Sequence, residues 1–64
     1  MKHLVKVPFV PDMGSISPFI VSDSHGETKA ANALWHLNSM RDHDGLDHLN
    51  RMPNGTTYEP VEDN

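Results

Sequence analysis

Apolar residues occupy alternate positions near the start of the chain. Val5, Val7 and Phe9 are separated by a lysine and a proline. A period of two residues is typical of a strand with one buried face. We therefore predict a strand over residues 3–10.

Two further segments have strand character. Residues 11–14 combine proline, aspartate and glycine, which predicts a chain reversal before the apolar segment 16–21. We expect that segment to form the second strand. A second turn signal at 53–55, Pro-Asn-Gly, precedes the β-branched and aromatic residues of 56–61, which predict a third strand.

The stretch between the second and third strands has helical periodicity. Its apolar residues recur three and four positions apart and would form one stripe on a helix; they are Ala30, Ala33, Leu34, Leu37 and Met40. The sequence Ser-His-Gly-Glu at 24–27 fits a capping box, in which serine and glutamate satisfy the first backbone amides. We therefore predict that the helix starts there.

The end of this helix is predicted near residues 42–45. Leu46 follows Leu37 by nine residues, and at about 100° per residue it would fall on the opposite face of a continuous helix. A short second helical turn solves this conflict, with Asp44 as its N-cap and with Leu46 and Leu49 facing inward. The alternative is a continuous helix on which Trp35 and Leu46 form a second apolar face suited to a partner.

These elements predict one small α+β domain over residues 1–64. The order is β-β-α-β, and a crossover helix places the third strand beside the first, giving the sheet order 2-1-3 with the helix on one face. The other face and at least one edge then lack cover. Two copies could pair through that edge, and we expect residues 62–64 to fray.

Charge changes the functional interpretation. The chain has a formal net charge of −4 and no cysteine, and most of the excess negative charge lies in its second half. The acidic residues there are Asp42, Asp44, Asp47, Glu59, Glu62 and Asp63, against Arg41 and Arg51. This distribution disfavours binding to phosphate backbones and suits a partner with a basic surface. The missing cysteines and the absence of a signal-peptide or membrane-spanning pattern favour a cytoplasmic location.

One short segment has candidate metal ligands. Residues 42–48 contain two histidines and three aspartates, and imidazole and carboxylate groups bind zinc and related metals. The candidate ligands are His43, Asp44, Asp47 and His48. Their spacing matches neither the H-E-x-x-H pattern nor a calcium loop, and capping and surface roles around a helix end are the simpler interpretation.

Other chemistry has less support. No nucleophile elbow or glycine-rich phosphate loop occurs, and a chain this short offers little room for a substrate pocket. We therefore expect neither catalysis nor a cofactor. Nucleic-acid binding would depend on Lys2 and Lys6, of which we expect Lys6 on the uncovered sheet face. Two lysines are a weak basic patch for an acidic chain.

A protein-interaction module remains the favoured function. Trp35 is the sole tryptophan, either a boundary residue at the edge of the core or an interface anchor. We expect partner contacts from Trp35, Asp42, Asp44, Asp47, Glu59 and Glu62, docking a small adaptor or inhibitor on a larger, basic-surfaced protein. A short acidic chain beginning at methionine has the general character of phage-encoded proteins that disable host enzymes, a likeness of composition alone.

Overall fold

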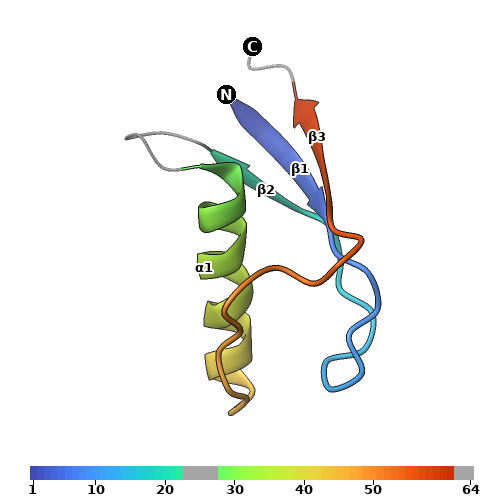
Figure 1. Ribbon diagram of the computed structural model, residues 1–64, viewed down its shortest axis with the longest axis vertical. Helices are drawn as coiled ribbons and strands as arrows, with labels where there is room; N and C mark the ends of the chain where they lie inside the picture. The colour runs from blue at the N-terminus through green and yellow to red at the C-terminus, as the bar shows by residue number, and fades with distance from the viewer. Residues whose placement is uncertain (23–27, 62–64) are drawn as a thin grey trace.

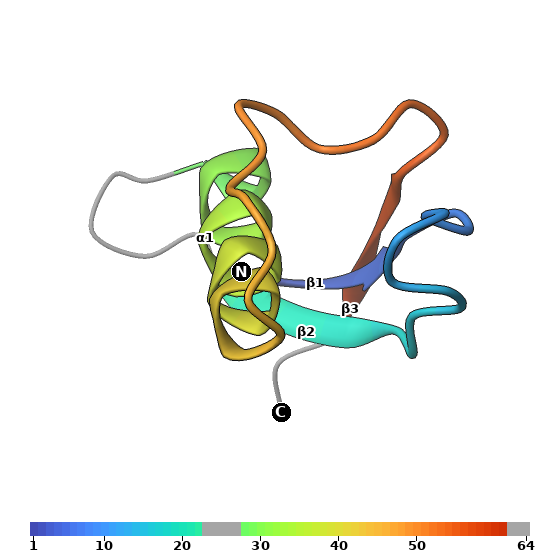
Figure 2. The same cartoon turned by 90° about the horizontal axis from the view of Figure 1, so that it is seen from below.

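A computed structural model describes residues 1–22 and 28–61. The chain forms three strands and one helix: β1 (Lys2–Lys6), β2 (Phe19–Ser22), α1 (Lys29–His43) and β3 (Thr57–Val61). The sheet order is β2-β1-β3, and both strand pairs are antiparallel. Figure 1 shows α1 on one side of this sheet, and Figure 2 shows the same arrangement from below. The predicted α+β class, element order and strand order are confirmed.

The inner face of the sheet is built from directly opposed residues. Val5 of the central strand lies opposite Phe19 on β2 and opposite Tyr58 on β3. Opposed residues of antiparallel strands point to the same face, so these side chains meet beneath the helix. Val5 and Ala33 are fully buried in this core, and Val21, Phe19 and Tyr58 complete it together with Met52 from the loop before β3.

The buried stripe of α1 consists of Ala33, Leu37 and Arg41, spaced four residues apart. Thr28 is the N-cap, and its hydroxyl accepts a hydrogen bond from the Ala31 amide at 3.1 Å. The capping box predicted at 24–27 lies outside the described residues. Of the predicted stripe, only Ala33 and Leu37 are buried; Leu34 and Met40 are half-buried and Ala30 is exposed.

The helix ends where the sequence predicted. Asp44 is the C-cap, and Gly45 has a φ of 75°, a left-handed conformation that glycine adopts without steric cost. The predicted second helical turn is wrong, because residues 46–49 have no regular secondary structure. The alternative of a continuous helix through Leu46 is wrong as well.

Side chains of the helix replace the missing helical turn. Asn38 donates to the Leu49 carbonyl at 3.1 Å and accepts from the Leu49 amide at 2.8 Å, and Arg41 donates to the Asp47 carbonyl. These bonds satisfy the backbone of the loop in a non-helical path, as buried polar groups require. The orange loop in Figure 1 therefore follows α1 before it crosses to β3.

Strand boundaries differ from the predictions near the first turn. β1 ends at Lys6, and the chain reverses through residues 10–14, where the Gly14 amide donates to the Val10 carbonyl at 2.6 Å. The second strand is shorter at its start than predicted: β2 begins at Phe19, and residues 16–18 precede it. β3 spans nearly all of the predicted segment.

The opposite side of the sheet, here called the open sheet face, has no helix over it. Its residues alternate with those of the core and are Lys2, Leu4, Lys6, Ile20, Ser22, Thr57, Glu59 and Val61. Ile20, on the edge strand β2, is half exposed. The expectation that one sheet face lacks a covering element is confirmed for the part of the chain that the structure describes.

One buried polar atom leads to a test of the core. His3 is 5% exposed, and its Nδ1 atom has no hydrogen-bond partner among the described residues. A buried, unpaired polar group costs about 1–3 kcal/mol. We therefore expect His3→Leu to raise the free energy of unfolding by about 1–2 kcal/mol in urea denaturation. His3→Ala should lower it, because it leaves a cavity; a stability loss in both variants would contradict the argument.

Candidate functional site

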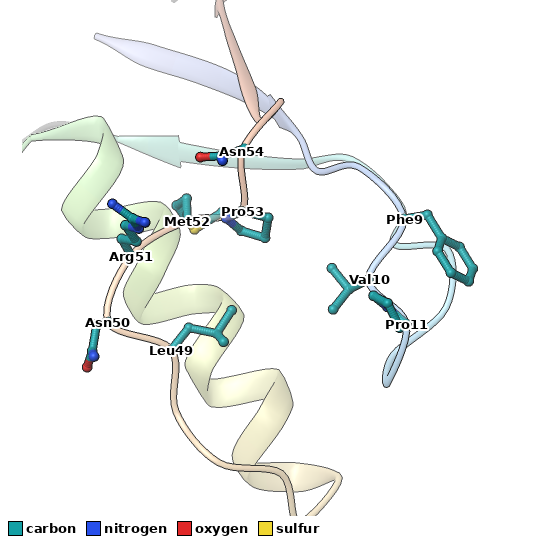
Figure 3. A pocket seen from close by; sticks show the side chains of 9 residues that line it. All are labelled: Phe9, Val10, Pro11, Leu49, Asn50, Arg51, Met52, Pro53 and Asn54. Atoms are coloured by element: carbon teal, nitrogen blue, oxygen red, sulfur yellow. The ribbon is translucent and has the colours of Figure 1, made fainter.

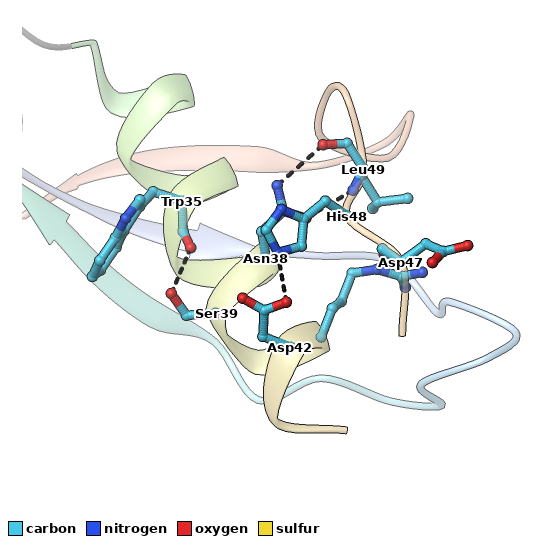
Figure 4. Close-up of polar contacts among 8 residues, drawn as sticks. Trp35, Asn38, Ser39, Asp42, Asp47, His48 and Leu49 are labelled. Carbon is cyan, nitrogen blue, oxygen red and sulfur yellow. Dashed lines mark hydrogen bonds and ion pairs between the residues drawn. The ribbon is translucent and has the colours of Figure 1, made fainter. Parts of the chain in front are cut away.

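The outer face of α1 carries the most exposed aromatic side chain among the described residues. Trp35 is 73% exposed, and it points away from the stripe of Ala33 and Leu37. The interpretation of Trp35 as a boundary residue that covers the core edge is therefore wrong. Ser39 and Asp42 follow it at four and seven positions, so the three lie along one side of the helix, as Figure 4 shows.

The C-terminal end of α1 is surrounded by carboxylates. Asp42, Asp44 and Asp47, here called the acidic helix end, are all exposed. The last turn of a helix presents unpaired carbonyl groups with a partial negative charge. Acidic side chains at that position repel it, so the acidic helix end concentrates negative potential about two turns along the helix from Trp35.

Arg41, the arginine of the last helical turn, is buried and has its main partner outside this region. The side chain of Arg41 is 5% exposed, and its guanidinium makes two parallel hydrogen bonds with the Asp12 carboxylate, both at 3.0 Å. Such bidentate pairs are strong and geometrically specific. The charge of Arg41 is therefore compensated mainly by Asp12 in the 10–14 turn, with a smaller attraction to Asp47.

The Arg41 contact also explains a pKa change. Hydrogen bonding from the guanidinium lowers the pKa of Asp12 below its ordinary value of 3.8, and the same contact raises the pKa of Arg41. On the sheet, burial raises the pKa of Tyr58, whose ring also lies 5.9 Å from the Lys29 ammonium group.

The predicted metal ligands do not converge. His48 contacts Asp42 instead, with 2.7 Å between Nε2 and Oδ1, and this contact closes the loop onto the helix (Figure 4). Within residues 1–22 and 28–61, no three His, Asp or Glu side chains lie close enough to hold a metal ion. His43, Asp44, Asp47 and His48 therefore form no preassembled ligand set.

The remaining predicted contacts separate into different surfaces. Glu59 lies on the open sheet face and forms an ion pair with Lys6, with 3.2 Å between Nζ and the carboxylate. This pair reduces the positive charge that the nucleic-acid alternative requires of that face. Glu62 lies outside the described residues. Trp35 and the acidic helix end thus remain as the one group of predicted partner contacts on α1 and the loop after it.

A groove of about 480 Å³ opens between the first turn and the loop before β3. Figure 3 shows Val10 and Pro11 on one side of it and Leu49 and Pro53 on the other. None of the predicted site residues lines this groove. Sequence reasoning did not foresee it, because its two walls are more than thirty residues apart in the chain.

Arg41 is the residue that sequence reasoning missed. It was counted as a surface charge opposing the acidic half, whereas the structure buries it against Asp12. The available signal was its spacing: Arg41 follows Leu37 by four residues and therefore continues the buried stripe. An arginine at that position predicts an acidic partner from another segment, but not which one.

The Asp12–Arg41 pair predicts a pH dependence of stability. Because folding lowers the pKa of Asp12, the pair stabilises the folded state above about pH 4 and loses this effect as pH falls through the folded pKa. Asp12→Asn should therefore lower the melting temperature near pH 7, and its difference from wild type should shrink toward about pH 2.

Thermal melts across this pH range, followed by circular dichroism, measure the effect. Asp44→Asn is the matched control, since it removes an exposed carboxylate that makes no ion pair with the described residues. It should leave the acid dependence of the melting temperature close to that of wild type. A constant difference between wild type and Asp12→Asn at all pH values would contradict the ionic role of Asp12.

Comparison of the chain with protein-family models, with curated protein sequences and with solved structures finds no match. Within the described residues, no helix is long and apolar enough to span a bilayer. Any function must therefore be argued from the exposed surface itself.

Proposed function

We propose that this chain is a non-catalytic interaction module that docks on a basic surface of a larger protein through the outer face of α1. The observation that carries this proposal is the 73% exposure of Trp35 on the same side of the helix as Asp42. Tryptophan is enriched among the residues that dominate binding energy. An exposed tryptophan on the same side of a helix as carboxylates offers an apolar contact for the partner. The negative charge of the carboxylates favours a partner with a basic surface.

The chemistry of this face favours a cationic partner group. The face of an indole attracts lysine and arginine side chains, and Asp42 lies about 10 Å along the helix from Trp35, at 1.5 Å per residue. One basic side chain could stack on Trp35 while a neighbouring one pairs with the acidic helix end. Two adjacent basic residues on the partner would satisfy both contacts.

Electrostatics at the helix terminus adds to this preference. Asp42 and Asp44 lie where the helix already has partial negative charge, and Arg41 is turned inward to Asp12. A partner cation would relieve the repulsion among these groups. Pairing these aspartates with a partner cation would therefore contribute more to the binding free energy than pairing the same number of aspartates on a loop far from a helix end.

The module would act by covering a surface of its partner. As an adaptor it would link that surface to another protein, and as an inhibitor it would mask a basic surface that the partner needs for its own ligand. The cysteine-free sequence suits a reducing cytoplasm. We favour these roles over metal binding by the 42–48 segment, whose predicted ligands are not brought together.

Trp35 provides a direct test, because it is the sole tryptophan and its fluorescence reports on this face alone. We expect a peptide of alternating lysine and arginine to change the Trp35 emission saturably. Asp42→Asn combined with Asp44→Asn should weaken the apparent affinity about tenfold, equivalent to about 1.4 kcal/mol. The interaction should weaken between about 0.1 M and 1 M salt, where the screening length falls from about 10 Å to 3 Å.

Two outcomes would contradict the proposal: an emission change that is identical for a glutamate-rich peptide, or one that is unaffected by the double aspartate substitution. The protein partner can then be sought by affinity capture at low salt with wild type, Trp35→Ala and Phe9→Ala. Phe9 is a matched control because it is 68% exposed but lies on the first turn, away from α1. A genuine partner should be lost with Trp35→Ala and retained with Phe9→Ala.

A further inference from the structure

The turn before β3 contains the pair Asn54–Gly55, a combination in which asparagine is chemically labile. Both residues are exposed, and they occupy the two central positions of a turn that Thr56 closes on Pro53. The Thr56 amide donates to the Pro53 carbonyl at 3.2 Å, and its hydroxyl donates to the same oxygen at 2.7 Å. Gly55 has a φ of 94°, the left-handed conformation that a type II turn requires at this position. Figure 3 shows Asn54 on the loop that leads into β3.

The atoms that react in such a pair are adjacent here and are not held by other groups. Asparagine is thermally labile because the main-chain nitrogen of the next residue can attack its side-chain carbon Cγ. Glycine has no side chain to hinder that attack. Within residues 1–22 and 28–61, neither Asn54 nor Gly55 makes a hydrogen bond. The Asn54 side chain can therefore rotate onto the Gly55 nitrogen.

Other asparagines of the chain are held by the fold. The Asn38 side chain donates to the Leu49 carbonyl and accepts from the Leu49 amide, and Asn32 donates to a carbonyl of β2. Both lie inside α1, where the amide of the following residue is bonded within the helix. Asn50 is exposed, but the residue after it is Arg51, whose long side chain hinders approach to the main-chain nitrogen. Exposure, a following glycine and an unbonded amide thus coincide at Asn54.

A second glycine provides a contrast within the same structure. Asp44–Gly45 is the equivalent pair with aspartate, which can form the same ring. The Gly45 amide donates to the Asp42 carbonyl at 3.1 Å, and Asp44 is the C-cap of α1. The nitrogen that would attack is therefore engaged in the helix end. The fold protects this pair and leaves Asn54–Gly55 open to reaction.

We propose that Asn54 is a site of spontaneous deamidation, at which the chain is converted to aspartate and isoaspartate as it ages. The Gly55 nitrogen loses its proton and bonds to Cγ of Asn54. The bond from Cγ to Nδ2 breaks, and ammonia leaves with that proton. Water then opens the five-membered imide. Breaking the bond from the nitrogen to Cγ gives aspartate, and breaking the bond from the nitrogen to the main-chain carbonyl carbon gives isoaspartate. The reaction needs only water and is independent of docking through Trp35.

The isoaspartate product would alter the start of β3. Its main chain runs through the former side chain and is one carbon longer, so the turn can no longer hold Thr56 on the Pro53 carbonyl. β3 begins at the next residue, Thr57, which pairs with Lys6 of the central strand. Each conversion also adds one negative charge to the groove that Asn54 lines. The age of a chain would therefore change both the stability of β3 and the charge of the groove.

Incubation of the purified chain at mildly alkaline pH and body temperature tests the site. Peptide mapping by mass spectrometry should find a gain of one mass unit at Asn54, at least about tenfold faster than at Asn32, Asn38 and Asn50. A protein isoaspartate methyltransferase should accept the product. Direct hydrolysis of the side-chain amide would give aspartate alone, so methylation identifies the imide route.

Two variants separate the chemistry from the fold. Asn54→Gln keeps an amide in the turn, but its extra methylene requires a larger ring that closes slowly, so this variant should gain no mass at position 54. Gly55→Ala should slow the reaction at least about tenfold. Alanine disfavours the φ of Gly55, so circular dichroism must show that this variant is folded. In wild type, Asp44–Gly45 should gain no isoaspartate over the same period.

The products are then separated by ion exchange and melted. The isoaspartate form should melt roughly 4–8 °C below wild type, because the hydrogen bonds of the turn are lost. Asn54→Asp, which has an ordinary main chain, should melt close to wild type. Equal melting of the isoaspartate form and wild type would refute the effect on β3.

The site itself is overturned if Asn54 in the folded chain keeps its amide over a period in which a guanidinium-unfolded chain loses it. It is also overturned if Asn54→Gln gains mass as fast as wild type, or if the product contains no isoaspartate. Faster loss at Asn38 or Asn50 would show that the hydrogen bonds and exposure described above do not decide which asparagine reacts.

Discussion

The bidentate contact between Arg41 and Asp12 is the interaction on which the arrangement of this small fold depends. It joins the last turn of α1 to the first turn of the chain, two segments 29 residues apart that have no strand pairing between them. The same guanidinium donates through Nε to the Asp47 carbonyl. One side chain therefore fixes the helix end, the 10–14 turn and the loop after α1 relative to one another.

This use of Arg41 has an energetic logic. A nearly buried guanidinium must have its donors satisfied, because a buried charge without partners is strongly destabilising. Asp12 and Asp47 supply acceptors from two separate segments, so the helix end can be buried only if both segments are in place. The contact thus fixes how the helix end, the 10–14 turn and the loop after α1 are arranged. The apolar core, centred on Val5 and Ala33, does not reach this part of the fold.

The consequence for the surface is an imbalance of charge. Because Arg41 is directed inward, the carboxylates of the acidic helix end have no exposed arginine or lysine beside them on α1. Asp42 contacts His48 there, and this contact is an ion pair only when the imidazole is protonated. Arg41 is needed in the interior and is therefore missing from the surface. Its absence there leaves the negative potential that we propose as the basis of partner recognition.

Much of the fold could be predicted because its signals are local. Alternation in β1, the glycine at 45 and the stripe through Ala33 and Leu37 each report on residues that are neighbours in the element itself. The extra helical turn was wrong for the opposite reason. Asn38 and Arg41 satisfy the loop backbone through side-chain hydrogen bonds, and such bonds between segments leave no periodicity in the sequence.

The candidate sites also combine local signals, which the sequence carries, with contacts between segments, which it does not. The exposure of Trp35 follows once Ala33 and Leu37 are known to face the core. Trp35 is two residues from each of them, and at about 100° per residue it therefore falls on the opposite side of the helix. The direction of the buried stripe is set by Arg41, which continues the stripe as a charged residue and so shifts it away from Ala30 and Met40. The identity of Asp12 as the partner of Arg41 required the tertiary structure.

The division of α1 into faces connects these observations. The inner face requires only Ala33, Leu37 and Arg41 for packing, so the other faces of the helix are not constrained by the core. Trp35 occupies one of them at 73% exposure and contributes little apolar burial to folding. His36 lies on another, where its ring stacks on Phe19 of β2. Because the inner and outer faces use different side chains of one rigid helix, stability and the proposed partner docking can be altered separately by substitution, which makes the two roles independently testable in so small a chain.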